Sequence, residues 1–139
     1  MLQLRYISEE NIKESIDTTN EWLIGWKKNR IDPDLFPTSG LIMEDTETGE
    51  EVFIGYTWFS NSKLAQIGFI TRNPNYSKQK LAKQNKESFI RELISYCYKN
   101  GYNHIITWTD HPILIHDFKK IGFTETSDKT SELIIKIVE

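Results

Sequence analysis

The sequence predicts an α/β (α+β) domain whose elements follow the order β-α-β-β-β-α-β-α-β-β. Two observations lead to this order. Short segments alternate apolar with polar residues between turn residues, which is typical of strands, and three other segments repeat apolar residues at helical spacing. The chain has 139 residues, close to the commonest size of one domain. We therefore expect a single domain over residues 1–139.

The first part of the chain contains a strand, a helix and a loop. Residues 2–6 alternate apolar and polar side chains and predict the first strand. Ser8 is a candidate N-cap for the following helix, whose apolar positions recur every three or four residues between 12 and 26. Two prolines and a glycine then predict a loop over residues 29–40.

Three antiparallel strands are expected in the middle of the chain. LIMED (41–45) and VFIGYTWF (52–59) flank the turn residues TETGE and predict a hairpin. The turn SNSK leads into LAQIGFI (64–70), which predicts the third strand, and NPN (73–75) ends it.

The last part of the chain supplies two helices and three strands. A helix is predicted from about Lys78 to Lys99, with Gly101 at the position just past its end. HIITW (104–108) predicts a buried strand, and Pro112 stands where a short helix would begin. The segments FTET (123–126) and ELIIKIV (132–138) predict the final two strands.

Composition and charge exclude several classes of function. The net charge of −3 gives no overall attraction to nucleic acid or to an anionic membrane. No apolar run approaches the length that crosses a bilayer, and the N-terminus does not have the pattern of a signal peptide. Cys97 is the single cysteine, which favours a reducing compartment. We expect a cytoplasmic protein without nucleic acid or membrane as a partner.

The stretches LAQIGFITRNPNYSK (64–78), KNGYNHIITWTD (99–110) and HPILIHDFKKIGF (111–123), with the order of elements, resemble the GNAT (Gcn5-related N-acetyltransferase) superfamily. The resemblance implies a mixed, twisted sheet of six to seven strands with helices on both faces. It also implies that the two central strands splay apart and that acyl-CoA lies in the gap between them. Acetyl-CoA is then the implied cofactor.

The implied cofactor site departs from the pattern of the superfamily, which has Gln/Arg-x-x-Gly-x-Gly/Ala before the long helix. Alignment on Tyr76 places Lys80 at the first glycine and leaves only Ala82 in agreement. Lysines surround the start of the helix instead, either as a solvated face or as a site for an anion, which is the diphosphate of CoA or an acidic partner surface. The residues expected to bind a cofactor are Phe69, Ile70, Thr71, Ser77, Lys78, Lys80, Ala82 and Lys83.

The implied catalytic groups are incomplete. Phe118 stands where the superfamily often has the tyrosine that protonates the CoA thiolate. Gln66 on the central strand cannot act as a base, which leaves three candidates if the chain is active: Glu44, Asp110 and His111. No metal site is expected, because His111 and His116 lie five residues apart and do not share a helical face well.

Two functions from different classes remain. The first is a binding or assembly protein, because the degenerate motifs also look like those of the acetyltransferase-like virion proteins of short-tailed bacteriophages. Its partner would be a virion or host protein, in the host cytoplasm or the virion. The alternative is an active acetyl-CoA-dependent N-acetyltransferase acting on a small amine or a protein amine. Trp22 and Trp26 are expected in the core, with a partner groove as the alternative.

Overall fold

The computed structural model describes residues 1–109 and 112–124 of the chain. They fall into two compact units, Met1–Ile106 and a second unit that begins at Thr107. The expected single domain stays a prediction. No helix in these two ranges is both long and apolar enough to cross a membrane.

The first unit is built on a five-stranded mixed sheet. Four strands form an antiparallel meander, and the fifth pairs with the fourth in parallel, which confirms the predicted mixed sheet. Of the last two predicted strands only Phe123 and Thr124 are described, and neither is in a strand. In spatial order the strands are β1 (Leu2–Ile7), β2 (Ser39–Asp45), β3 (Glu51–Phe59), β4 (Leu64–Arg72) and β5 (His104–Ile106).

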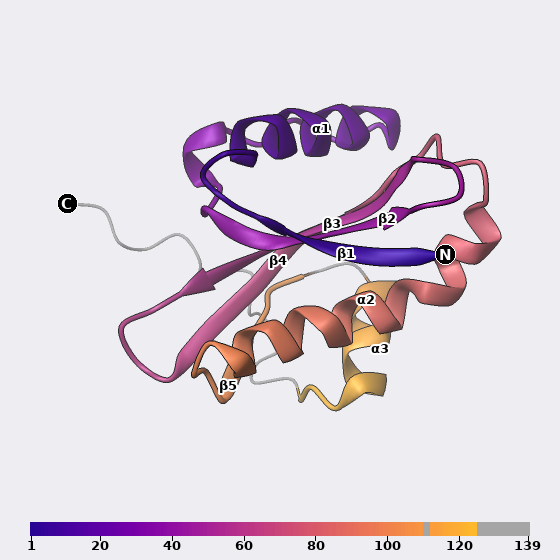
Figure 1. The fold of residues 1–139 in the computed structure, drawn as a ribbon. Helices are drawn as coiled ribbons and strands as arrows, with labels where there is room; N and C mark the ends of the chain where they lie inside the picture. Colours follow the sequence, from indigo (N-terminus) through magenta and orange to yellow (C-terminus); the bar gives the residue numbers. More distant parts are fainter. Residues whose placement is uncertain (110–111, 125–139) are drawn as a thin grey trace. The chain divides into compact units, whose positions relative to one another are not determined.

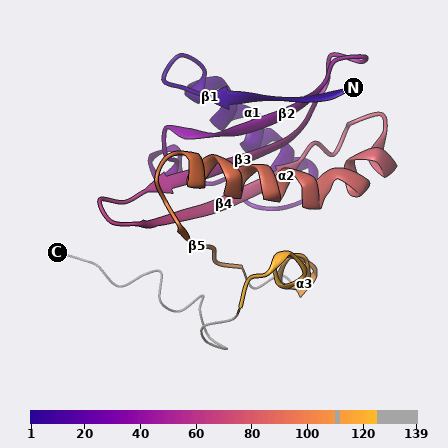
Figure 2. The same ribbon diagram turned by 60° about the horizontal axis from the view of Figure 1, so that its bottom comes forward.

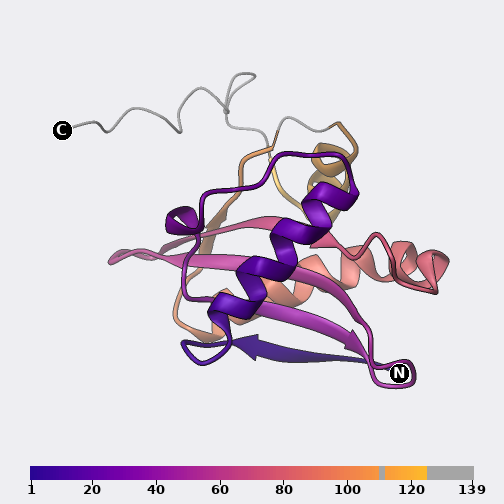
Figure 3. The ribbon, with the colours of Figure 1, turned by 90° about the horizontal axis from the view of Figure 1, so that it is seen from above.

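Two helices cover opposite faces of this sheet, as predicted (Figures 1 and 2). Helix α1 (Ile12–Gly25) lies across one face (Figure 3), where Trp22 packs with Tyr56 and the isoleucines of three strands. Helix α2 (Gln79–Lys99) lies on the other face, where Phe89 stacks on Phe53 with 5.2 Å between ring centroids. The alternation of side chains along each strand explains why neighbouring residues serve opposite faces.

The start of α1 differs from the prediction that Ser8 caps it. The helix begins three residues later than that cap implies, after Asn11, whose side chain makes no capping hydrogen bond. The Asn11 side chain instead accepts a hydrogen bond from the Ser8 N–H and donates one to the Tyr6 carbonyl. The Asn11 N–H also donates to the Ser8 carbonyl at 3.2 Å. A closed turn therefore separates β1 from the helix.

The end of α2 follows the prediction. Gly101 has φ +96°, in the left-handed region that favours glycine, and the Tyr102 N–H donates to the Cys97 carbonyl at 3.1 Å. Cys97 itself is fully buried, and burial raises the pKa of its thiol to about 11. The thiol is therefore protonated at neutral pH and has a packing role.

The second unit contains helix α3 (Pro112–Ile121), which begins at Pro112 as predicted. Gly122 ends it with φ +123°, and the Phe123 N–H donates to the Phe118 carbonyl at 3.0 Å. The rings of Phe118 and Phe123 meet edge to face, with centroids 5.1 Å apart. Phe118, where the resemblance implies a tyrosine, thus makes an apolar contact within its own unit.

Candidate functional site

A β-bulge interrupts β4 in the middle of the sheet. Thr71 pairs with Ile54 and Gly68 pairs with Tyr56, so two residues of β4 oppose Gly55 alone. Phe69 has φ +50°, which is uncommon for a residue with a large side chain. Bulges of this kind break the ladder locally and are frequent next to functional sites. The bulge therefore removes Phe69 and Ile70 of the predicted segment 69–71 from regular pairing with β3, whereas Thr71 stays in register with Ile54.

Strand β5 pairs along its whole length with the first three residues of β4. The parallel register joins Leu64 to His104 and ends with Gln66 opposite Ile106. Strand β4 continues to Arg72, whereas β5 ends at Ile106. The bulge therefore lies in the part of β4 that continues beyond the register with β5, and the predicted splay of the two strands stays a prediction.

Aromatic rings gather beside the bulge on the face of the sheet that carries α1. The ring of Phe69 lies 5.1 Å from that of Phe36 and 5.1 Å from that of Trp58, between centroids. A side chain at Gly68 would meet the indole of Trp58, since a Cβ there would lie 3.2 Å from its ring. The glycine thus allows the indole to lie over β4. These rings are partly exposed and could contact an apolar group held at the bulge.

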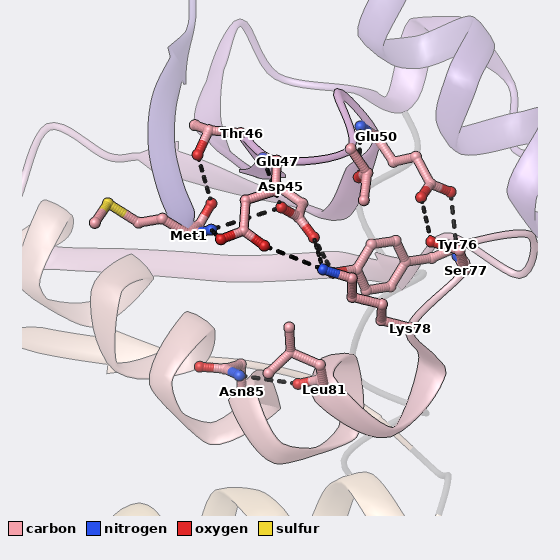
Figure 4. Close-up of polar contacts among 11 residues, drawn as sticks. Met1, Asp45, Thr46, Glu47, Glu50, Tyr76, Ser77, Lys78, Leu81 and Asn85 are labelled. Atoms are coloured by element: carbon pink, nitrogen blue, oxygen red, sulfur yellow. Dashed lines mark hydrogen bonds and ion pairs between the residues drawn. The ribbon is translucent and has the colours of Figure 1, made fainter.

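The tip of the β2–β3 hairpin braces the loop between β4 and α2 (Figure 4). The Tyr76 hydroxyl donates to Asp45 Oδ2 at 2.6 Å, and both side chains are buried. Lys78 Nζ lies 3.6 Å from Asp45 Oδ2 and 3.3 Å from Glu47 Oε2. Lys78 is therefore paired with carboxylates of the same chain, and its role in binding a cofactor stays a prediction.

Ser77 is engaged in the same way by Glu50 (Figure 4). The Ser77 N–H donates to Glu50 Oε2 at 3.1 Å, and its hydroxyl donates to Glu50 Oε1 at 2.5 Å. An internal carboxylate thus occupies both donors of a residue predicted to bind a phosphate. Of the other predicted cofactor residues, Ala82 is fully buried and its N–H donates to the Lys78 carbonyl. Lys80 and Lys83 are exposed.

These contacts shift the pKa values of the groups that make them. The Tyr76 hydrogen bond, helped by the Glu47 N–H and the charge of Lys78, lowers the pKa of Asp45 to about 2 against the opposing effect of burial. Burial and the Asp45 hydrogen bond raise the pKa of Tyr76. The Ser77 hydroxyl lowers the pKa of Glu50, and the hydrogen bond to Glu47 raises the pKa of Lys78. The cluster is charged at neutral pH.

Replacing Tyr76 with phenylalanine is expected to lower the stability of the protein at neutral pH and to weaken the dependence of that stability on acid pH. The Asp45 pKa of about 2 lies below the ordinary 3.8, so the stabilisation is complete above about pH 4 and is lost as pH falls through about 2. Loss of the hydroxyl removes the largest cause of this shift and raises the Asp45 pKa. Urea unfolding at neutral pH and near pH 3 should show lower stability and a smaller change between the two.

Tyr98→Phe is the matched control, because this tyrosine is 70% exposed. It should unfold as the wild type does at both pH values. An unchanged pH dependence in Tyr76→Phe would contradict the assignment of Tyr76 as the main partner of Asp45.

Glu44, a candidate general base, is not brought to the bulge. Its carboxylate lies 3.2 Å from Arg5 Nε and accepts a hydrogen bond from Gln3 Nε2 at 3.3 Å. Arg5 also pairs with Glu51, and burial raises the pKa of Glu51. Glu44 lies on β2, with β3 between it and β4. Glu44 and Glu51 are therefore both paired with Arg5, and the role of Glu44 as a base stays a prediction.

The remaining catalytic candidates, Asp110 and His111, lie outside the described residues. In the described ranges, no group of three or more histidine, cysteine, aspartate or glutamate side chains is arranged to hold a metal ion. The residues that sequence analysis missed are Asp45, Glu47 and Glu50 as partners of the loop. One signal in the sequence could have indicated these contacts. The turn of the β2–β3 hairpin is acidic, and it lies at the same end of the sheet as the loop that follows β4.

Comparison with known proteins gives matches in structure only. No family model matches the chain, and no curated protein matches it in sequence. A GNAT family acetyltransferase from Brucella melitensis in complex with acetyl-CoA matches with TM-score 0.65 and 12% identity over 90% of this chain and 84% of its own. A predicted acetyltransferase from Clostridium acetobutylicum, also with acetyl-CoA, matches with 0.63 and 15% over 92% and 93%. A transcriptional regulator from Bacillus halodurans matches with 0.61 and 14% over 92% and 96%.

Proposed function

We propose that this chain, which has the GNAT fold, acts by binding a protein partner rather than by transferring an acyl group. The observation that carries the proposal is the Glu50 carboxylate on both donors of Ser77. An assembly role, like that of the acetyltransferase-like virion proteins of short-tailed bacteriophages, is the setting we propose. The partner would then be a virion or host protein, met in the host cytoplasm or the virion.

Electrostatics at the loop support this proposal. A diphosphate is a strong anion that binds where backbone N–H groups and positive charge are available. Here three carboxylates, those of Asp45, Glu47 and Glu50, contact the loop residues and Lys78. An entering diphosphate would have to displace Glu50 and would be repelled by the other two. The exposed ammonium groups of Lys80 and Lys83 would also attract a diphosphate, but salt screens the attraction between charges on the surface.

An acetyl-CoA-dependent N-acetyltransferase is the second candidate, and the bulge at Phe69 favours it. Peptide N–H groups of Phe69–Thr71 would polarise a thioester carbonyl placed beside β4, and the rings near Phe69 would contact the acceptor. Lys80 and Lys83 would hold the phosphates, with Asp110 or His111 as base and water as the proton donor in place of Phe118. The acceptor would be a small amine or a protein amine.

Calorimetric titration with acetyl-CoA and with CoA, at low and moderate salt, separates the two candidates. We expect no micromolar binding to the wild type. Glu50→Gln keeps an acceptor for Ser77 and removes the charge, so it should bind CoA at least about tenfold more tightly than the wild type. Glu21→Gln removes the same charge from an exposed position of α1 and should leave binding unchanged.

Micromolar binding to the wild type that is lost in Lys80→Ala/Lys83→Ala would overturn the proposal in favour of acyl transfer. An acceptor screen would then be the next experiment. Lys63→Ala, in the exposed turn between β3 and β4, controls for the general loss of positive charge.

A further inference from the structure

Arg72, the last residue of β4, carries a positive charge that is held in place without a carboxylate partner in the described part of the chain. Its guanidinium carbon lies 4.7 Å from the centroid of the Trp26 ring. The Trp26 Nε1–H donates to the Arg72 carbonyl at 2.8 Å. Arg72 Nε is buried and has no hydrogen-bond partner among the described residues. Arg72 thus differs from Arg5 and Lys78, which both pair with acids.

The packing of the end of α1 on the loop after β4 brings Trp26 and Arg72 together. A Cβ on Gly25 would lie 2.7 Å from Pro74 Cγ, so the end of α1 packs closely on the loop that follows β4. Trp26 comes directly after this contact. A partly desolvated cation without a counter-charge costs free energy, and burial lowers the pKa of Arg72. A bound oxyanion would relieve that cost by accepting from the guanidinium.

Three further cations follow Trp26 in the chain. Lys27, Lys28 and Arg30 are exposed, and none pairs with a carboxylate in the described ranges. The negative end of the α1 dipole accounts for part of this preference for lysine. It does not account for Arg72, which belongs to a strand. The resulting concentration of positive charge is opposite in sign to the net charge of −3.

We call the set of five residues described above the basic–aromatic corner: Trp26, Lys27, Lys28, Arg30 and Arg72. We propose that this corner binds an acidic segment of the partner protein. Arg72 is the anchor, because its planar donors suit a carboxylate and Trp26 already fixes its position. The inference rests on the proposed binding function and names the chemistry of the partner.

A protein carboxylate suits the corner better than a nucleic acid does. Recognition of single-stranded nucleic acid usually combines basic groups with aromatic rings on which bases stack. Here the guanidinium of Arg72 covers a face of the Trp26 ring. The net charge of −3 also opposes association with a polyanion as a whole.

The test is binding of a short fluorescent peptide in which Glu alternates with Ser, measured by anisotropy on the full chain. The same peptide with Gln in place of Glu, and a single-stranded DNA of equal charge, serve as comparison probes. We expect the Glu peptide to bind, to weaken with salt, and to lose about tenfold or more in affinity in Arg72→Gln. The Gln peptide should not bind.

Two further variants keep the test decisive if Arg72→Gln disturbs the packing of Trp26. Lys28→Gln/Arg30→Gln leaves the contact between Trp26 and Arg72 in place and should weaken binding severalfold. Lys63→Gln, at an exposed position elsewhere in the first unit, should not weaken it. If the wild type, Arg72→Gln and Lys28→Gln/Arg30→Gln bound the Glu peptide equally well, the proposal that the corner binds an acidic segment would be wrong. Equal affinity of the wild type for the Glu and Gln peptides would contradict it as well.

Tighter binding of the DNA than of the Glu peptide would replace the protein partner with a nucleic acid. If the protein bound neither the Glu peptide nor CoA, the proposal of an acidic-segment site would be wrong, and the proposed binding function would stand. Micromolar CoA binding would overturn the binding function on which the corner rests.

Discussion

Replacing Gly40 with alanine is expected to lower the free energy of unfolding by more than about 3 kcal/mol or to prevent folding. Gly40 lies on β2 opposite Tyr56 of β3. A Cβ at this position would lie 2.2 Å from the Gly55 carbonyl oxygen and 2.9 Å from the Tyr56 Cα. Both are main-chain atoms, so the clash is relieved only by moving β3. Urea unfolding followed by circular dichroism measures the loss.

Gly49→Ala is the contrasting control. Gly49 lies in the hairpin turn with φ +76°, and a Cβ there would meet nothing within 4 Å. Its replacement should cost only left-handed backbone strain, about 1–2 kcal/mol. If Gly40→Ala were as stable as Gly49→Ala, the close approach of β2 to β3 at this point would be wrong.

Replacing Gly55 and Leu93 with alanine, singly and together, is expected to show that the two residues affect the free energy of unfolding jointly, because α2 packs on the sheet at Gly55. A Cβ on Gly55 would lie 2.7 Å from Leu93 Cδ1 and 3.0 Å from Phe89 Cε2. Gly55→Ala should cost about 1–3 kcal/mol through overpacking, and Leu93→Ala about 2–5 kcal/mol through the cavity it leaves. The double variant should cost less than the sum, because the new methyl group fills part of that cavity.

Unfolding of the wild type, both single variants and the double variant gives the coupling energy directly. Ile42→Ala combined with Leu93→Ala is a comparison pair of buried residues for which no close contact is expected, since Ile42 packs with Trp22 on the face that carries α1. Additive costs for Gly55→Ala and Leu93→Ala would contradict the close packing of α2 on Gly55.

The order of elements from β1 to α3 was predictable because local patterns encode it. Helical spacing gave α2 nearly to the residue, since Gly101 marks its end with a conformation that glycine adopts easily. The start of α1 was predicted three residues early, because Ser8 has the chemistry of a cap but Asn11 closes the preceding turn. Trp22 is buried as predicted, whereas Trp26 is 37% exposed and contacts Arg72.

The site was less predictable because its contacts join distant parts of the chain. Glu50 and Ser77 are far apart in sequence, and nothing local to either shows that they meet. The same holds for Glu44, whose pairing with Arg5 depends on the register between β1 and β2. Residues 69–71 were singled out through resemblance, but the φ of +50° at Phe69 has no signature in the sequence.

The bracing of the loop by the hairpin tip has a consequence for dynamics. A loop with the sequence Asn-Pro-Asn would ordinarily open independently of the rest, at low free energy. Here Tyr76, Ser77 and Lys78 are tied to Asp45, Glu50 and Glu47. The first turn of α2 therefore cannot fray without also releasing the β2–β3 turn. The two segments form one cooperative opening unit, and amide hydrogens in both should exchange with solvent at a common rate.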